Sequence, residues 1–391
     1  MATENTLYRH RSNGTYPHAL TSKYTKKPKN INRNYNTIEN PLAKEGRDGH
    51  VPTTYKRKSN GWVGIAQNKT AVTGEHEIDI LDKLKGCNGV MKIEIVYKQD
   101  GKYTILTEFK KGGDLISFIN AHVKTKIDDE TICNIMRQIC KAIQCVHEKG
   151  ICHLDLKPNN VVIDKSYKIT IIDFETARTV DENGLCTIGD KIGTLNYMSP
   201  ELKAIVKKAI VKKAGDPLNF KFNGFAVDKY AIARILEDIS KYASTNPDLY
   251  TKLITTIKTN RWQYDMTEIF REIDRTEEIF REIVRTKYKY MFDEMEADVE
   301  LIEMINSCKK LKNSTDIKTC YNKTKAYILT GLPDYTKEEE KAVDLFLHDK
   351  GIHQLEQLGG KKLYRKYTRT CTKKQRKHRT KKQRKQRTRR A

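Results

Sequence analysis

Two short polar stretches in the middle of the chain constrain its fold most strongly. They are His153–Asn160 (His-Leu-Asp-Leu-Lys-Pro-Asn-Asn) and Ile172–Glu175 (Ile-Asp-Phe-Glu). The first holds an Asp, a Lys two residues later and an Asn five residues later, and another Asp follows after thirteen more. Phosphoryl transfer needs these groups, because Mg²⁺ prefers oxygen ligands and a cation must meet the phosphate. Either stretch alone could be a polar turn between strands, so the surrounding sequence has to decide.

These two stretches resemble the catalytic loop and the metal-binding loop of the protein kinase family. The resemblance implies that Asp155 is the catalytic base and that Lys157 contacts the γ-phosphate of ATP. It also implies that Asn160 and Asp173 are the Mg²⁺ ligands. ATP and Mg²⁺ are therefore the expected cofactors, and a protein is the expected substrate.

Further motifs follow in the order that they have in this family. They are Thr107–Leu115 (the hinge between lobes), Gly193–Glu201 (the end of the activation segment), Asp228–Ala233 (a buried helix) and Asn260–Trp262. By resemblance, Asp228 anchors the backbone of the catalytic loop, and Arg261 pairs with Glu201. Motifs in this order between residues 43 and 262 are far more specific than any one alone.

The same resemblance assigns further site residues. Backbone groups near Glu108 would hold adenine, and Asp114 would bind the ribose. The hydroxyl of Thr194 would bond both Asp155 and Lys157. Lys157 and Thr194 are also the signature of serine/threonine kinases, which disfavours a tyrosine kinase.

The sequence thus predicts an α+β, two-lobed protein kinase fold. Antiparallel hairpins around Asn60-Gly61 and Gln99–Gly101, with one helix between them, predict a small β-sheet lobe at about 35–108. A mainly helical large lobe is expected at about 112–286.

The ends of the chain have a different character from the kinase domain predicted at 35–286. Residues 1–34 are expected to be a disordered basic arm, 287–358 a helical extension and 359–391 a disordered basic tail. The tail from Lys361 holds 17 Lys and Arg and no acidic residue, which leaves +7 of the net charge of +24 for the rest.

The basic tail has two interpretations. In the first, it is a solvated, disordered polycation. In the second, it attaches the protein electrostatically to nucleic acid or to another polyanion, such as an acidic protein or an anionic membrane, or it acts as a nuclear localisation signal. The tail and the Lys/Asn/Ile-rich composition resemble kinases of large cytoplasmic DNA viruses. This resemblance covers composition, not motifs.

The phosphate-covering loop of the small lobe matches the family only in part. Gly46, Gly49 and Val51 match the second half of the family's glycine-rich loop, whereas Lys44 stands in place of the first glycine. Glycines serve there because the backbone must approach phosphate closely. A simple β-turn is the alternative interpretation.

A lysine in the third strand should pair with a helix glutamate, and Glu77 matches that glutamate. The family has Ala-x-Lys, but here Ala66 is followed two residues later by Asn68. We assign the role to Lys69, which would face away from the nucleotide unless a bulge shifts it. The alternatives are Lys56 and Lys58, or a solvated Lys69 and Glu77.

Two substitutions lie beside the expected catalytic residues. Leu154 replaces the arginine that would receive an activation-segment phosphate, so activity is not expected to need phosphorylation of Thr179, Thr187 or Thr194. Glu175 replaces the glycine after Asp-Phe, where it either disturbs Mg²⁺ or points to solvent.

Nine cysteines are scattered without any Cys-x-x-Cys pair, which favours a reducing compartment and argues against disulfides and structural zinc. Cys140 lies on a helical apolar stripe and is expected to be a core thiol. No apolar run reaches the roughly 18 residues of a membrane span. The predicted location is intracellular and cytoplasmic, with the nucleus or a virion also open, and the oligomeric state is left open.

Four functions remain to be compared. The first is an active serine/threonine kinase, and the second is a pseudokinase that kept the fold as a binding or scaffold module. The third is a small-molecule phosphotransferase of the aminoglycoside or choline kinase type, which the Gly193–Glu201 segment disfavours. The fourth is a basic nucleic-acid-binding protein, which leaves the ordered motifs unexplained.

Overall fold

The computed structural model describes most of the chain between residues 35 and 352. The described residues are 35–38, 53–57, 63–99, 101–110, 112–181, 184–188, 193–211, 220–262, 265–311, 314–332 and 335–352. The predicted arm, the predicted glycine-rich loop at Gly46–Val51 and the predicted tail lie outside them. The chain divides into two units between Glu277 and Glu278, inside helix α9 (Thr267–Lys287), and each unit is described by itself.

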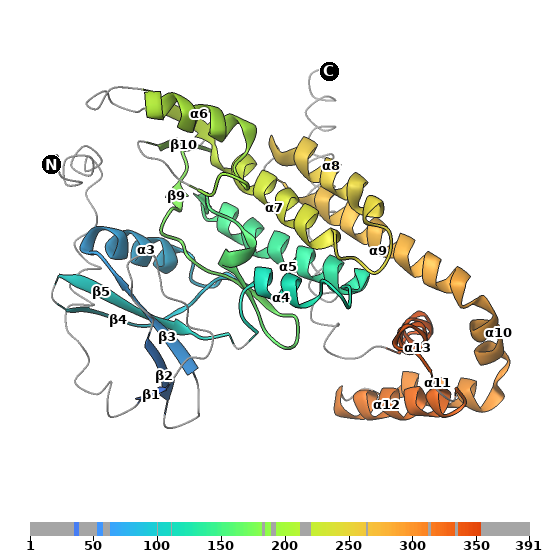
Figure 1. Cartoon of the computed structure of the whole chain (residues 1–391). Coiled ribbons are helices and arrows are strands. Elements are labelled where there is room, and N and C mark those ends of the chain that lie inside the picture. The colour runs from blue at the N-terminus through green and yellow to red at the C-terminus, as the bar shows by residue number, and fades with distance from the viewer. Residues whose placement is uncertain are drawn as a thin grey trace, which may run out of the picture. The chain divides into compact units, whose positions relative to one another are not determined.

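Five strands form the sheet of the small lobe, and every neighbouring pair is antiparallel. In sheet order they are β1 (Tyr35–Ile38), β2 (Thr53–Arg57), β3 (Val63–Lys69), β5 (Lys102–Glu108) and β4 (Ile93–Gln99). The helix α3 (Ala71–Lys83) lies over one face of this sheet (Figure 1). Both predicted hairpins and the helix between them are confirmed.

Helix α3 follows directly from the end of β3. It begins after Thr70, whose hydroxyl accepts a main-chain N–H of the first turn and so caps the helix. Ile78 of α3 is buried in one cluster with Tyr103 and Ile105 of β5. The neighbouring residue Glu77 is also fully buried, so helix α3 brings this carboxylate away from solvent.

The large lobe is mainly helical, with short strand pairs around the catalytic loop. Its elements in chain order are α4 (Leu115–Ala121), α5 (Asp129–Glu148), β6 (Ile151–Cys152), η2 (Pro158–Asn160), β7 (Val161–Ile163), β8 (Ile169–Ile171), β9 (Arg178–Thr179), β10 (Leu185–Ile188), α6 (Pro200–Val211), β11 (Phe220–Asn223), α7 (Gly224–Ser240), η3 (Pro247–Tyr250), α8 (Thr251–Thr259), η4 (Asn260–Trp262) and α9. The strands pair β6 with β9, β7 with β8 and β10 with β11.

Helix α5 forms the core of the large lobe together with α7, which lies beside it (Figure 1). Asp128 caps its start, because its carboxylate accepts the N–H of Thr131 at 2.8 Å. The predicted apolar stripe and Cys140 are completely buried. Gly150, with a φ of 68°, turns the chain directly after the helix into β6 and the catalytic loop.

The second unit continues as a small helical bundle with its own core. Its further helices are α10 (Lys289–Ala297), α11 (Val299–Lys310), α12 (Ser314–Thr330) and α13 (Lys337–Asp349). Their buried apolar side chains form one cluster, which includes Leu301, Ile305, Tyr321, Phe346 and Leu347. None of the helices in the described part of either unit is both long and apolar enough to cross a membrane.

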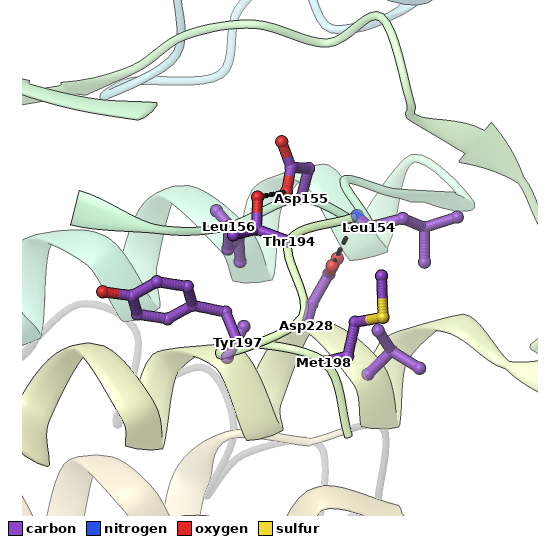
Figure 2. Close-up of a pocket in the computed structure, with 9 residues that line it drawn as sticks. Leu154, Asp155, Leu156, Thr194, Tyr197, Met198 and Asp228 are labelled. Carbon is purple, nitrogen blue, oxygen red and sulfur yellow. Dashed lines mark hydrogen bonds between the residues drawn. The ribbon is translucent and has the colours of Figure 1, made fainter. Parts of the chain in front are cut away.

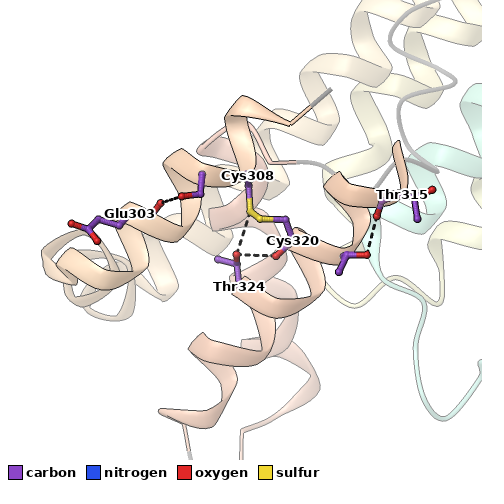
Figure 3. Close-up of a disulfide and its surroundings, with 7 residues drawn as sticks. Glu303, Cys308, Thr315, Cys320 and Thr324 are labelled. Carbon is purple, nitrogen blue, oxygen red and sulfur yellow. Dashed lines mark hydrogen bonds between the residues drawn. A yellow bond between two sulfur atoms is a disulfide. The ribbon is translucent and has the colours of Figure 1, made fainter. Parts of the chain in front are cut away.

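Two disulfide bonds correct the prediction that the cysteines are unpaired. Cys87 is bonded to Cys145 in the first unit, and Cys308 is bonded to Cys320 between α11 and α12 in the second (Figure 3). The Cα atoms of the two pairs are 5.7 and 5.6 Å apart, within the range that a disulfide spans. The prediction was wrong because pairing depends on which elements pack together, and the linear spacing of the cysteines does not contain that information.

Candidate active site

The predicted catalytic loop brings three polar side chains into direct contact. Asp155 accepts hydrogen bonds from the hydroxyl of Thr194 at 2.7 Å and from the ammonium of Lys157 at 2.6 Å. The same ammonium donates to the hydroxyl oxygen of Thr194 at 2.9 Å. Figure 2 shows Asp155 and Thr194 facing each other across the site. The end of the activation segment is thereby fixed to the catalytic loop, with the hydrogen bonds that the resemblance implied.

A buried carboxylate below the loop holds its backbone in place. Asp228 of α7 accepts the main-chain N–H groups of His153 and Leu154, both at 2.8 Å, and Figure 2 shows the bond to Leu154. This anchor supports the strained backbone of Leu154, whose φ is 66°. His147 also donates to Asp228, at 2.9 Å. Sequence reasoning missed His147, although it lies four residues after Ile143 on the apolar stripe of α5.

The two residues predicted as Mg²⁺ ligands lie on loops that are bonded to each other. The main-chain N–H of Ile172 donates to the carbonyl of Asn160 at 2.9 Å, and His153 donates to the carbonyl of Ile172 at 3.0 Å. The side-chain amide nitrogen of Asn160 donates to the carbonyl of Asp155 at 2.8 Å, which leaves its amide oxygen for a ligand. Asp173, with a φ of 65°, turns a partly exposed carboxylate out of this loop.

These oxygens fit Mg²⁺, which prefers few protein ligands and completes its shell with water and phosphate oxygens. Among the described residues, no group of three or more His, Cys, Asp and Glu side chains is arranged to hold a metal ion by itself. A cation at Asn160 and Asp173 would therefore need ligands from a bound molecule, which is how a nucleotide brings Mg²⁺ into such a site.

Lys69 lies among three carboxylates. Its ammonium is 3.4 Å from Glu77, 3.8 Å from Asp173 and 2.8 Å from Glu175, the last distance being a hydrogen bond. Burial lowers the pKa of Lys69, but the attraction of Glu77, Asp173 and Glu175 outweighs burial and raises the pKa above its usual value. The lysine is therefore a fixed positive charge at neutral pH.

The position of Lys69 requires no bulge in β3. The ladder between β3 and β5 is continuous, with Lys69 opposite Tyr103 and Ala66 opposite Leu106. Because side chains alternate along a strand, Lys69 and Ala66 lie on opposite faces of the sheet. The face of Lys69 is the one that packs against α3, since Tyr103 shares its buried cluster with Ile78. No bulge shifts Lys69, so it lies on the face opposite Ala66, as the alternation of side chains predicts. From that face its ammonium still reaches Glu77 and Asp173.

Glu77 is a completely buried carboxylate, not the solvated side chain that was one alternative. It accepts the main-chain N–H of Phe174 at 3.1 Å in addition to its ion pair with Lys69. Burial raises the pKa of Glu77, while Lys69 and the Phe174 N–H oppose that rise. Glu77 therefore connects helix α3 both to the strand lysine and to the loop of Asp173 and Phe174.

The predicted nucleotide contacts at the hinge lie where β5 ends and α4 begins. Glu108 is the last residue of β5, and its carboxylate pairs with Lys110 at 2.8 Å. Asp114 caps α4 by accepting the N–H of Ser117 at 2.9 Å, and its other oxygen accepts the side chain of Asn159 at 3.3 Å. The residues of the predicted glycine-rich loop, Gly46, Gly49 and Val51, lie outside the described part of the chain. The same holds for the two alternatives to Lys69, namely Lys58 and the side chain of Lys56.

The activation segment is held to the large lobe by an apolar cluster. Leu154, with only 3% exposure, is one of its members, and β10 of the segment pairs with β11. The other buried members are Cys152, Cys186, Met198, Leu202, Val206, Phe222, Phe225 and Val227. Next to this cluster, Arg261 lies 3.6 Å from Glu201, the ion pair that the resemblance implied.

Comparisons with known proteins agree with this geometry. Residues 45–216 match the family model of the protein kinase domain. Serine/threonine-protein kinase RAD53 of Saccharomyces cerevisiae is 35% identical over 159 residues, which cover 40% of this chain and 18% of that protein. Serine/threonine-protein kinase ppk16 of Schizosaccharomyces pombe is 29% identical over 191 residues, or 44% of this chain and 28% of that protein.

Serine/threonine-protein kinase cds1 of Schizosaccharomyces pombe is also similar, with 30% identity over 128 residues, which cover 33% of this chain and 27% of that protein. The chain thus spans less than a third of the length of each of these three relatives. The two-lobed α+β fold is that of a protein kinase: residues 45–216 match the protein kinase domain model, and part of the chain is similar to serine/threonine-protein kinases.

Proposed function

We propose that the chain is an active serine/threonine protein kinase, which transfers the γ-phosphoryl group of ATP to a hydroxyl group of a protein substrate. The contact among Asp155, Lys157 and Thr194 carries this proposal, because it joins a carboxylate base, a cation and the end of the activation segment. A docked activation segment provides the platform on which a protein substrate is positioned, and a small-molecule phosphotransferase has no need of it.

In this mechanism the protein positions groups and neutralises charge. Bound Mg²⁺ would offset the charge of the ATP phosphates, with Asn160 and Asp173 as its protein ligands. Asp155 would accept the proton of the substrate hydroxyl, whose oxygen forms a bond to the γ-phosphorus while the bond to ADP breaks. Lys157 would meet the γ-phosphate, and Lys69 would bind the other phosphates.

A pseudokinase is the second candidate, and one observation favours it. The shortest contact of Lys69 is with Glu175, a residue that replaces the family's glycine, and not with Glu77. A lysine bound by an additional carboxylate is less free to bind phosphate. The buried Lys69–Glu77 pair is nevertheless present, and this pair must be in place for phosphoryl transfer in kinases.

Transfer of radiolabel from γ-labelled ATP with Mg²⁺ tests the proposal. Wild type should label serine or threonine of generic acidic or basic proteins, whereas Asp155→Asn should lose at least about 99% of the activity, since general-base catalysis contributes roughly 10²-fold or more. Asp248→Asn, the same change at an exposed position in η3, is the matched control and should keep full activity. Equal labelling by wild type and Asp155→Asn would contradict the role of Asp155, and no labelling by folded wild type would favour the pseudokinase.

Two finer features are part of the same proposal. The basic tail from Lys361 would attach the enzyme to nucleic acid or another polyanion, with a binding affinity that falls steeply with salt. An origin in a large cytoplasmic DNA virus stays a prediction that rests on composition alone.

A further inference from the structure

Glu175 forms the shortest polar contact of Lys69. Its carboxylate accepts a hydrogen bond from the ammonium at 2.8 Å, whereas Glu77 and Asp173 lie 3.4 and 3.8 Å away. From the sequence, Glu175 was expected either to disturb Mg²⁺ or to point to solvent. In the structure its carboxylate binds Lys69 instead. Glu175 extends the pair of Lys69 and Glu77 into a group of one cation and three carboxylates.

The carboxylates of this group differ in their freedom to move. Glu77 is fully buried and its other oxygen accepts the N–H of Phe174, so a move away from Lys69 would leave a buried carboxylate without its cation. The Glu175 side chain is 42% exposed, and only its bond to Lys69 fixes the carboxylate among the contacts that define this site. An incoming anion can therefore displace Glu175 from Lys69 and leave Glu77 in place.

We propose that Glu175 is a positioning residue that occupies the ammonium of Lys69 until a nucleotide phosphate displaces it, and that it makes nucleotide binding depend on a divalent cation. This inference rests on the proposed function, because it treats Lys69 as a phosphate-binding residue. Three carboxylates outnumber the single ammonium, so a polyphosphate without a cation is repelled. A divalent cation bound with the phosphates offsets this excess of negative charge and allows Glu175 to turn towards solvent.

Binding of ATP to the whole chain, with Mg²⁺ or with EDTA, tests the inference by calorimetry. Glu175→Gln keeps the size of the side chain and removes its charge. It should bind ATP about tenfold more tightly than wild type in EDTA, as expected for removing one unit charge a few ångströms from the phosphates at a half-exposed site. In Mg²⁺ the gain should fall below about threefold, because the cation already offsets the charge. Glu130→Gln, at the far end of α5 from the catalytic loop, is the matched control and should bind like wild type.

A second readout follows Lys69 itself in the absence of nucleotide. Acylation of its amine by an N-hydroxysuccinimide ester, measured by mass spectrometry, should be several-fold faster in Glu175→Gln, because the amine loses its closest partner. Lys83, which pairs with Asp79, is an internal reference that should react equally in both proteins. A purely structural role of Glu175 would change neither the cation dependence of binding nor the ratio of the two lysines.

The outcomes separate the inference from the proposed function. Equal ATP affinity of wild type and Glu175→Gln in EDTA would overturn the inference and leave the proposed function intact. Weaker binding of Glu175→Gln in Mg²⁺ would also overturn it, because Glu175 would then be a metal ligand. If neither folded protein binds ATP under either condition, the proposed function fails, and the inference fails with it.

Discussion

Lys229 is an unusual residue in this kinase fold, because a lysine side chain with 0% exposure lies inside the large lobe. It follows Asp228 in α7, and its ammonium donates to the carbonyl of Asp265 at 3.4 Å. Burial lowers its pKa to about 8, against partial opposition from Cys140 and Asp265. A buried charge of this kind costs stability whenever the folded protein has to hold the proton.

Replacing this lysine by methionine should therefore stabilise the protein at neutral pH. In unfolded chains the pKa is 10.5, so between pH 8 and 10.5 the unfolded state binds more protons and stability rises with pH. Below about pH 8 the full penalty applies, up to about 3 kcal/mol for this shift. Lys229→Met should be more stable than wild type at pH 7, and the difference should disappear towards pH 10.5. Denaturant unfolding at both pH values measures this, and a difference independent of pH would contradict it.

Residue identity predicted some contacts of the site well and others not at all. Asp155, Lys157 and Asn160 lie within six positions of each other, so one loop conformation fixes their geometry and the local sequence predicts it. The choice of Lys69 depends on which face of β3 meets α3, a tertiary property that the strand alone does not contain. The contact between Lys69 and Glu175 joins residues 106 positions apart, and no local pattern indicates it.

At the level of elements, the activation segment is held by packing. β10 pairs with β11, and the apolar cluster around Leu154 lies where the family has an arginine. The absence of this arginine could be predicted from the sequence, because it depends on the identity of one residue, Leu154. It did not predict the pairing of Cys186 with Phe222, which are 36 residues apart and come together only when the fold forms.

This arrangement predicts activity without phosphorylation of the exposed threonines of the segment. The residue before Asp155 is a buried leucine, so a phosphate at Thr179 or Thr187 would meet no cation at that position. The double variant Thr179→Ala, Thr187→Ala should keep at least about half of the wild-type kcat/KM, because the segment is already docked. Thr194→Ala is the contrasting control and should lose roughly tenfold or more, since it removes a hydrogen bond to a charged carboxylate. Loss of activity in the double variant, with unchanged folding, would show that phosphorylation is required.

For the whole molecule, the division into two units means that each has its own core and its own disulfide. The first unit has the core around α5 and α7 and the bond between Cys87 and Cys145. The second has the cluster of α10–α13 and the bond between Cys308 and Cys320. A reducing location was predicted from the scattered cysteines, and such a location would keep both pairs open. The oxidation state of these cysteines therefore decides how much stability each unit has.

The double variant Cys308→Ser, Cys320→Ser should destabilise the second unit by about 3 kcal/mol, because the bond closes a loop with a sequence separation of 12. The variant Cys87→Ser, Cys145→Ser is the matched comparison. The bond removed in this variant closes a loop with a sequence separation of 58, so its loss should lower the stability of the first unit by about 4 kcal/mol. Calorimetry of the oxidised chain should assign each loss to one transition, and added ATP with Mg²⁺ identifies the transition of the first unit because ligand binding raises it. Excess dithiothreitol should lower the unfolding temperatures of both units in wild type. In each variant it should lower only the unfolding temperature of the unit that keeps its disulfide. If dithiothreitol left wild type unchanged, the two disulfides would be absent from the isolated protein, and this prediction would be wrong.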